Sequence, residues 1–402
     1  MINTRHLRAF VAVAQTGSVS QAASLVHRAQ SAVTRAIKEL EKGVGVPLFE
    51  RRPRGMLLTE FGRVLLNRSQ NAQFEMDAAR DAFAELARGR RWNAQAPVFL
   101  LGLSRQRLLV FAELIRQRHM GAVADTFAIS QPAVSQALRE IEQGVGLQLV
   151  ERTASGIVPN TLGSLLSIHL RRSLAEIAKA EEEIASLLHG VIGHVTVGTL
   201  SLARNRILPR AIIRLGRDHP GITLTTIEGT FEYLATLVRS SDLDFMIGGL
   251  REPEHMVGLT AQPVSEDRIA LIARNGHPLM QAGGVDRARL AEARWVLPLP
   301  GTWTRSSLET ALGTLGLPPP RVVVETADIS ITRSLVMESD LITAASPDLF
   351  RHELDDGSLI AIPADLPSPP REVGIIQRMG AAPTTAAQLL MSEIVSGARY
   401  RA

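Results

Sequence analysis

Hydrophobic residues recur at helical spacing through the first half of the chain, and the same pattern occurs there twice. The first amphipathic run ends at Gly17, a helix from Val19 to Leu25 follows, and a third helix runs from Gln30 to about Lys42. Residues 10–66 are repeated at residues 111–167 without a gap, at an offset of 101 positions. A repeat of this length predicts a duplicated module of domain size rather than a solenoid.

Each copy has two short helices, a tight link and a third helix with polar residues at its start, which predicts a helix-turn-helix. The third helix of such a unit lies in the major groove, with its first residues against the base edges. In copy one the expected DNA contacts are Ser18, Gln30, Ser31, Thr34, Arg35 and Lys38, and the expected inward residues are Ala32, Val33, Ala36, Ile37 and Leu40. In copy two the expected DNA contacts are Gln131, Pro132, Ser135, Gln136 and Arg139. The alternative is a generic three-helix packing without a DNA-binding role.

A short hairpin is expected after each third helix. In copy one, strands over residues 46–50 and 56–59 enclose a tip that carries Arg51, Arg52 and Arg54. A basic tip of this kind is a wing, suited to hold phosphates or to enter the minor groove. Copy two keeps only Arg152 at the equivalent place. We therefore expect copy one to supply most of the non-specific affinity for DNA.

A long amphipathic helix closes each copy, from about residue 60 to 88 and from about 162 to 188. A helix that is too long for its own small domain usually packs against another helix. We expect these two helices to pair within one chain, because tethering makes their association intramolecular. The residues expected to face each other are Phe61, Leu65 and Phe74 on the first helix and Leu165, Leu174 and Ile177 on the second. In the alternative arrangement, equivalent helices pair between two chains of a homodimer.

From His194 onward, short hydrophobic strands alternate with helices, which is the pattern of an α/β domain. Strands are expected over residues 194–198, 222–227 and 243–248, with a helix from Ile207 to Arg217 between the first two. Hydroxyl residues and glycines stand where several strands give way to helices, and such positions favour a carboxylate or another small anion. The alternative is that each hydroxyl only caps its own helix.

Composition and charge narrow the function classes. The chain has 402 residues, of which 45% are hydrophobic and 21% charged, as in an ordinary multidomain globular protein. It has no cysteine, which excludes disulfides and thiolate metal sites and fits a reducing cytoplasm. We expect neither a signal peptide nor a membrane span. Residues 1–92 hold 15 Lys and Arg against 8 Asp and Glu, whereas residues 101–190 hold 9 of each. The first segment is therefore suited to a polyanion, a solvated basic face being the alternative.

Residues 1–66 resemble the N-terminal domain of LysR-type transcriptional regulators almost throughout. The matching segments are Leu7–Phe10, Gly17–Val19, Gln30–Thr34, Ile37–Glu41, Leu48–Arg51 and Thr59–Gly62. Copy two is most similar to the family at Ser130–Ser135 and Gly144–Arg152, and it departs from the family at Arg118–Met120 and at its wing. A family member ordinarily has one such module. The tandem pair is a departure, and it resembles a branch related to the galactose-binding-protein regulators.

The second half, over roughly residues 193–396, resembles the type 2 periplasmic-binding-protein fold of the family's effector domain. The resemblance implies two lobes joined by crossings near residues 262–267 and 364–371, with an effector held between them at the carboxyl ends of strands. The residues implied for the effector are Thr199, Ser201, Gly229, Thr230, Gly301, Thr302, Thr304 and Ser330. Arg204, Arg206 and Arg305 are candidates for balancing an anionic effector, the alternative being that they are surface arginines.

The expected fold is therefore multidomain, with two winged helix-turn-helix domains on long linker helices and a two-lobed α/β effector domain. The expected boundaries are 1–60 and 105–161 for the winged domains, 61–92 and 162–190 for the linker helices, 93–104 for the inter-module linker, 193–263 and 370–396 for lobe I, and 266–367 for lobe II.

The predicted function is that of a sequence-specific transcription regulator controlled by a small carboxylate, sugar acid or aromatic acid. Its expected partners are double-stranded DNA, the effector and further copies of the chain in a dimer or tetramer, with RNA polymerase as a potential partner. No cofactor, metal or membrane is expected. One alternative is a DNA-architectural binder that senses no effector. Another is an enzyme, for which the sequence offers no Gly-x-Ser-x-Gly elbow, Gly-rich phosphate loop or paired-histidine metal motif.

Overall fold

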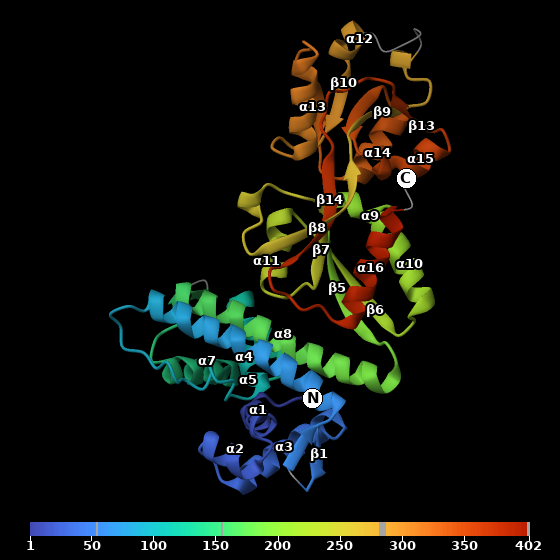
Figure 1. Cartoon of the computed structure of the whole chain (residues 1–402). Coiled ribbons are helices and arrows are strands. Elements are labelled where there is room, and N and C mark those ends of the chain that lie inside the picture. Colours follow the sequence, from blue (N-terminus) through green and yellow to red (C-terminus); the bar gives the residue numbers. More distant parts are fainter. Residues whose placement is uncertain (54, 154–155, 281–286, 400–402) are drawn as a thin grey trace.

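The computed structural model describes residues 1–53, 55–153, 156–280 and 287–399. It places two small winged modules on a pair of long helices, and a two-lobed α/β domain on the other side of that pair (Figure 1). Within the described residues, no helix is both long and apolar enough to cross a membrane.

The two winged modules have the same order of elements. Module one consists of η1 (Thr4–His6), α1 (Leu7–Thr16), α2 (Val19–Leu25), α3 (Gln30–Val44), β1 (Phe49–Arg52), β2 (Gly55–Leu58) and the long helix α4 (Glu60–Leu86). Module two consists of α5 (Arg105–Gln117), α6 (Met120–Phe127), α7 (Gln131–Val145), β3 (Val150–Thr153), β4 (Gly156–Pro159) and the long helix α8 (Thr161–His189). The first hairpin strand begins at Phe49, later than the predicted residue 46, and Ala32 is exposed rather than inward.

Equivalent contacts fix both modules in the same shape. The Glu41 carboxylate accepts a hydrogen bond from the Leu48 N–H at 2.9 Å, and Glu142 accepts the equivalent bond from Leu149 at 2.8 Å. Each long helix has a glycine in its first turn that packs against the residue before the hairpin: a Cβ on Gly62 would lie 2.2 Å from the Leu48 carbonyl oxygen, and one on Gly163 would lie 2.0 Å from that of Leu149. The repeat seen in the sequence is therefore also a repeat of tertiary contacts.

Helices α4 and α8 pack against each other in antiparallel orientation. Their buried contacts run in opposite directions along the two helices, because Arg68 meets Glu176 and Glu183 whereas Glu75 meets His169 and Arg172. The internal pairing expected from the sequence is thus present within one chain. Three of the side chains expected at the interface, Leu65, Leu174 and Ile177, are buried. Phe74 is 72% exposed, so its predicted place between the helices is wrong.

The segment between the modules packs into their common core. Residues 93–104, expected as a linker, contribute the buried side chains Ala96, Val98, Phe99, Leu101 and Leu103. Phe83 of α4, Trp92 and Phe99 form a cluster of aromatic rings with centroids 5.4–5.8 Å apart. One continuous hydrophobic core runs from Ile2 to Ile184, through both modules and both long helices. The N-terminal half is therefore a single packed body.

The α/β domain has one mixed five-stranded sheet in each lobe. Lobe I contains β5 (Gly193–Thr199), α9 (Ser201–Arg204), α10 (Ile207–Asp218), β6 (Ile222–Glu228), α11 (Phe231–Arg239), β7 (Phe245–Gly249), η2 (Pro253–His255), β8 (Leu259–Asp267), β14 (Arg371–Arg378) and α16 (Thr385–Arg399), with strand order β6-β5-β7-β14-β8. Lobe II contains β9 (Ala270–Arg274), η3 (Pro278–Met280), α12 (Arg287–Glu292), β10 (Arg294–Leu297), α13 (Trp303–Thr314), β11 (Arg321–Glu325), α14 (Ile329–Glu338), β12 (Leu341–Ala345), η4 (Pro347–Phe350), α15 (Arg351–Asp355) and β13 (Leu359–Ile362), with order β11-β10-β12-β9-β13.

Helices cover both faces of each sheet because successive strand residues alternate between two clusters. In lobe I, Phe245 and Ile247 of β7 pack with α10 and α16, whereas Met246 packs with α11. The chain crosses between lobes after β8 and before β14. The whole of β8, through Asp267, pairs with β14 in lobe I, so the first crossing lies just beyond the predicted residues 262–267.

Candidate DNA-reading and effector sites

The start of α3 presents polar side chains to solvent because its apolar positions are used for packing. Val33, Ala36, Ile37 and Leu40 are buried, and they leave the opposite side of the helix exposed. On that side, Gln30, Ser31, Arg35 and Lys38 are exposed and Thr34 is half-buried. The Gln30 side-chain amide donates to the Ser20 hydroxyl of α2 at 3.1 Å, which fixes its position. Ser18 caps α2 by accepting from the Gln21 N–H.

The start of α7 repeats this arrangement with different side chains. Gln131, Pro132, Gln136 and Arg139 are exposed, and Ser135 is half-buried. The Arg139 guanidinium donates to the Ser135 hydroxyl at 2.9 Å, so these two predicted contacts support each other. The polar starts of both third helices are therefore exposed to solvent.

The wing of module one is exposed and basic. Arg51 and Arg52 project from β1, and Arg52 forms an ion pair with Glu50 at 2.8 Å in which both side chains are more than half exposed. An exposed pair of this kind contributes only about 0–1 kcal/mol, so Arg52 can exchange Glu50 for a phosphate. Arg54 and the side chain of Arg152, also predicted DNA contacts, lie outside what the structure describes.

The carboxyl ends of the parallel strands in the two lobes face each other. Helix α9 follows β5 in lobe I, and η4 follows β12 in lobe II. The Asn205 side chain, directly after α9, donates to the Leu349 carbonyl oxygen at 2.9 Å, and Arg206 lies 3.3 Å from Asp348. Leu202 shares a hydrophobic cluster with Phe350 of lobe II. The lobes are therefore in direct contact at the strand ends where an effector was expected.

The eight predicted effector residues follow these strand ends, but they do not all have free hydrogen-bonding groups. Thr199 is buried, and Thr230 caps α11 by accepting from the Tyr233 N–H at 3.3 Å. The Thr302 hydroxyl donates to the Leu299 carbonyl oxygen at 2.9 Å. Ser201 and Ser330 are exposed, Ser201 as the first residue of α9 and Ser330 as the second of α14. The remaining three follow the same strand ends: Gly229, Gly301 and Thr304.

Three cations suggested for the effector are already paired with carboxylates. Arg204 lies 2.8 Å from Glu228, and Arg206 pairs with Asp348. Arg305 pairs with Glu309 within α13. Their charges are therefore balanced within the protein.

A different arginine, Arg371, was missed by the sequence reading. It begins β14, directly after the second crossing, and its guanidinium lies 4.2 Å from the centre of the Trp303 ring of lobe II. Burial lowers the pKa of Arg371 to about 10, against the opposing effect of Asp267, whose carboxylate is 3.7 Å away. Its Nε–H has no hydrogen-bond partner among the described residues. Its place after Pro369-Pro370 at a crossing was the only sequence signal that could have found it.

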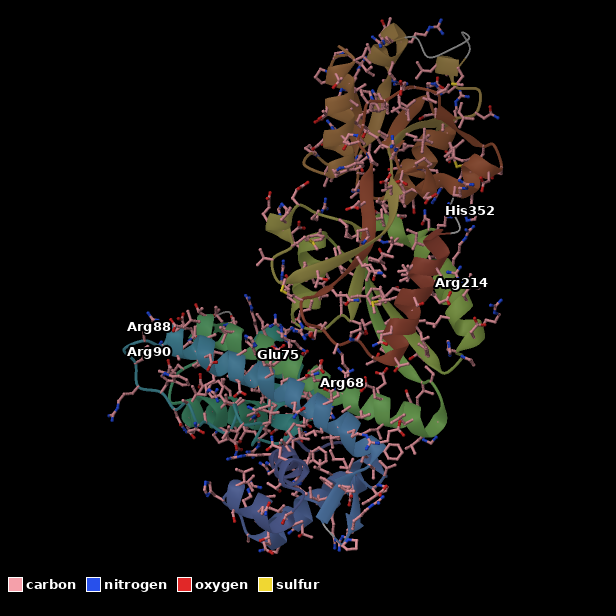
Figure 2. The ribbon with its side chains drawn as sticks, viewed as in Figure 1. Arg68, Glu75, Arg88, Arg90, Arg214 and His352 are labelled. Atoms are coloured by element: carbon pink, nitrogen blue, oxygen red, sulfur yellow. The ribbon has the colours of Figure 1, made fainter. Side chains whose placement is uncertain are left out.

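Strand β14 connects the surroundings of Arg371 to the long helices. Its last residue, Arg378, lies 2.9 Å from the Glu75 carboxylate of α4, which also contacts His169 at 3.0 Å and Arg172 at 3.5 Å. Burial alone would raise the pKa of Glu75, but the His169 hydrogen bond and the two arginine charges outweigh it and hold the pKa below its ordinary value. Arg68 and Glu75 lie along the helix pair on which lobe I rests (Figure 2).

A second set of contacts joins α4, α8 and lobe I near Arg68. The buried Arg68 guanidinium donates to Glu176 at 2.8 Å and to the Ala382 carbonyl oxygen of lobe I at 2.9 Å, and it also pairs with Glu183. Lys179 donates to the same two partners, Glu176 and Ala382, at 3.3 and 3.2 Å. Lobe I is therefore attached to both long helices.

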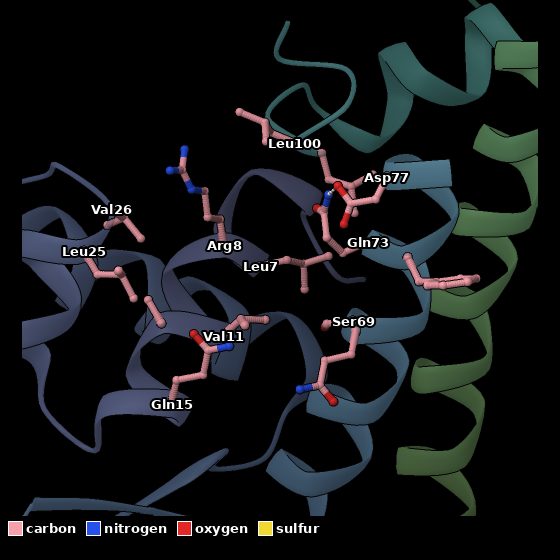
Figure 3. Close-up of a pocket in the computed structure, with 14 residues that line it drawn as sticks. Leu7, Arg8, Val11, Gln15, Leu25, Val26, Ser69, Gln73, Asp77 and Leu100 are labelled. Carbon is pink, nitrogen blue, oxygen red and sulfur yellow. Dashed lines mark hydrogen bonds between the residues drawn. The ribbon is translucent and has the colours of Figure 1, made fainter. Parts of the chain in front are cut away.

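A pocket of about 430 Å³ lies between α1 and α4 of module one. Figure 3 shows Leu7, Arg8, Val11 and Gln15 of α1 on one side and Ser69, Gln73 and Asp77 of α4 on the other. Phe74, which the sequence placed between α4 and α8, lines this pocket instead. No group of three or more potential metal ligands (His, Cys, Asp or Glu) occurs in the described part of the chain.

Comparisons with known proteins match both halves of the chain. The family model of the LysR substrate binding domain matches residues 189–399. The model of the bacterial regulatory helix-turn-helix protein, lysR family, matches twice, at residues 4–63 and 106–164. The second match coincides with module two.

Two relatives are named as transcriptional regulators. The HTH-type transcriptional regulator GalR of Pseudomonas putida is 38% identical over 390 residues, covering 97% of this chain and 96% of that protein. The HTH-type transcriptional regulator GbpR of Azospirillum brasilense is 33% identical over 264 residues, covering 65% of this chain and 77% of that protein. Full-length CbnR in complex with its target DNA has a TM-score of 0.53 at 16% identity, covering 74% of this chain and 99% of that chain, a likeness of fold.

Proposed function

Because the chain belongs to the LysR family of bacterial DNA-binding transcription regulators, we propose that it reads its target with both winged modules and responds to a small carboxylate held between its lobes. The carboxylate is an organic acid, a sugar acid or an aromatic acid. The protein acts in the cytoplasm as an oligomer, and RNA polymerase is a potential partner at the promoter. The DNA contacts are those described on α3, α7 and the wings.

The observation that carries the effector class is the buried cation Arg371, whose ion pair with Asp267, at 3.7 Å, is longer than those of Arg204 and Arg206, at 2.8 and 3.3 Å. Its guanidinium is mostly buried at the contact of the lobes, its Nε–H is without a partner among the described residues, and burial has lowered its pKa. A carboxylate supplies the charge and the acceptors that such a guanidinium favours. The Trp303 ring beside it adds a flat apolar surface that suits an aromatic acid. Ser201 and Thr304 then offer hydroxyls from strand ends in both lobes, whereas the Thr302 hydroxyl already donates to Leu299.

Strand β14 provides a route from the effector to the DNA-reading half. Arg371 stands at one end of this strand and Arg378 at the other, where it meets Glu75 of α4. A ligand that binds one arrangement of the lobes better than another shifts the protein toward that arrangement. A change in how lobe II meets Arg371 would thereby reach the helix pair on which both modules are mounted.

The proposal is tested by thermal denaturation of the full chain against a panel of organic, sugar and aromatic carboxylates. A ligand that binds only the folded protein raises its melting temperature. Loss of a hydrogen bond to a charged group corresponds to roughly ten- to a hundredfold in affinity, so Arg371→Gln should weaken binding of the active compound by that factor. Ser201→Ala and Thr304→Ala should each weaken it as well.

A matched control is Arg274→Gln, which removes an arginine paired with Asp340 in lobe II. We expect this variant to bind the compound like the parent chain. If Arg371→Gln and Arg274→Gln behave alike in chains of normal stability, the site is misplaced. If the chain binds DNA but no carboxylate of the panel changes its stability, it is the architectural binder considered above.

A further inference from the structure

The two third helices differ at outward positions that are equivalent in the repeat. With the offset of 101 residues, Arg35 of α3 corresponds to Gln136 of α7. Both side chains are exposed, and both stand six residues after their N-cap residues, Ala29 and Ser130. Each therefore lies on the second turn of its helix, near the end that faces bases in a helix-turn-helix.

Three other outward positions are more alike. Gln30 corresponds to Gln131, and Thr34 corresponds to Ser135, so the amide and the hydroxyl are kept. Lys38 corresponds to Arg139, which keeps the positive charge. Ser31 corresponds to Pro132, which removes a hydroxyl and offers no group in its place. The change from Arg35 to Gln136 is different, because it exchanges one hydrogen-bonding side chain for another: arginine has only donors, whereas glutamine has both donors and an acceptor.

These two side chains recognise different bases in the major groove. Arginine pairs in bidentate fashion with O6 and N7 of guanine, whereas glutamine pairs with N6 and N7 of adenine. Identical modules related by a two-fold axis read equal half-sites, which is why such proteins bind palindromes. Here the paired modules belong to one chain and are not identical, so nothing in the pairing requires equal half-sites.

We propose that one chain reads a non-palindromic pair of half-sites, with guanine opposite Arg35 and adenine opposite Gln136. This inference rests on the proposed reading of DNA by both modules. It also gives the bound protein a direction. Only α8 runs directly into the α/β domain, through the short segment from His189 to Gly193. When the two half-sites differ, each module binds its own half-site, so the α/β domain lies toward the half-site that module two binds.

The experiment is selection of bound duplexes from a random DNA library by the full chain, repeated with Arg35→Gln and with Gln136→Arg. The parent chain should enrich a pair of half-sites that differ at one equivalent position, guanine in one and adenine in the other. Arg35→Gln should change guanine to adenine in its half-site only, and Gln136→Arg should change adenine to guanine in the other. Each change should reverse the base preference by about tenfold.

Matched controls lie two turns further along the same helices. Lys42 and Gln143 are exposed and equivalent in the repeat, and each lies about 10 Å along its helix beyond Arg35 or Gln136, away from the base-reading end. The control substitutions are Lys42→Gln and Gln143→Arg. They should alter affinity without altering the enriched bases. Equal half-sites for the parent chain, or a change in both half-sites with one substitution, would overturn the inference while leaving DNA reading intact. Absence of any enriched sequence would overturn the proposed function and this inference with it.

Discussion

Glu182 lies where α8 meets the first strand of the α/β domain, and its carboxyl is packed against Gly193. Burial, with Asp244 nearby, raises the pKa of Glu182 to about 7. A group whose folded-state pKa is raised stabilises the fold fully below its unfolded pKa, near 4.5, and loses that contribution as pH rises through about 7. The attachment of the α/β domain to α8 should therefore weaken between about pH 4.5 and 7.

Glu182→Gln should abolish the loss of stability between about pH 4.5 and 7, because an amide does not ionise. We expect the variant to gain stability over the parent chain above pH 7, by about 2 kcal/mol after allowance for partial exposure. The measurement is the melting temperature of both chains between pH 5 and 9, with the exposed Glu254→Gln as control. Parallel pH curves for parent and Glu182→Gln chains would show that this carboxyl is not responsible.

Single residues also show where sequence reasoning stopped. Helical spacing identified the buried residues of α3, and Ala32 was misplaced because a small side chain is compatible with either side of a helix. Phe74 was assigned to the helix pair because it is large and apolar, but the groove between α1 and α4 exposes it. Arg371 was missed because, apart from its place after two prolines at a crossing, its significance depends on Trp303, 68 positions earlier in the chain. The local pattern predicts which face of a helix is buried, whereas tertiary contacts determine which element each side chain packs against.

At the scale of elements, the two hairpins have the same fold and different charge. The wing of module one presents Arg51 and Arg52, and the part of the module-two wing that the structure describes has Thr153 where module one has Arg52. Each lost phosphate contact reduces the slope of log affinity against log salt by about 0.9. Replacing Arg51 and Arg52 by Gln should therefore reduce the magnitude of the slope by about 2.

Binding to a random-sequence duplex between 50 and 200 mM salt measures this effect. Arg152→Gln should reduce the slope by no more than about 1. Arg351→Gln, on α15 of lobe II, should leave it unchanged. Equal losses from the two wings would mean that module two binds phosphate as strongly as module one.

Buried polar contacts join α4 to α8. Arg68 is 4% exposed, and Glu176, its partner, is 3% exposed. Removing one partner of a buried ion pair leaves an uncompensated charge and typically destabilises a protein by about 3–5 kcal/mol. Arg68→Met should therefore lower the stability of the helix pair by that order, less whatever Lys179 recovers by its own contact with Glu176.

Hydrogen exchange of the α4 and α8 amides detects such a loss locally. The control is Arg88→Met, which breaks an exposed pair with Glu85 and should change protection by 1 kcal/mol or less. Similar protection in both variants would show that the buried network adds nothing to the pairing.

Most elements followed from the sequence, since the helix pair, the third helices and the first strands of the α/β domain lie within a few residues of their expected positions. The segment 93–104 was expected only to span a distance, and instead its side chains fill the space between α4 and module two. Its apolar residues, from Ala96 to Leu103, follow no regular period. A segment with no period gives no signal of the core that it completes.

At the scale of the whole molecule, one chain holds two winged helix-turn-helix modules and one domain that matches the LysR substrate binding domain. The modules are paired through α4 and α8, and lobe I contacts both helices through Arg378, Ala382 and Asp242. LysR regulators form oligomers, and an internal pair leaves other surfaces for association between chains. The stoichiometry of two modules to one effector domain follows from the chain and does not depend on that association.

The central claim is that α4 pairs with α8 of the same chain, and cross-linking tests it most directly. Asn71 and Lys179 both reach Glu176, at 3.1 and 3.3 Å, and the chain contains no native cysteine. A chain with Asn71→Cys and Lys179→Cys, treated with a short bifunctional maleimide, should be joined internally and keep the mass of a single chain. Mixed chains that carry one cysteine each should not be joined. Cross-linked species found only at the mass of two chains, in both samples, would contradict the internal pair.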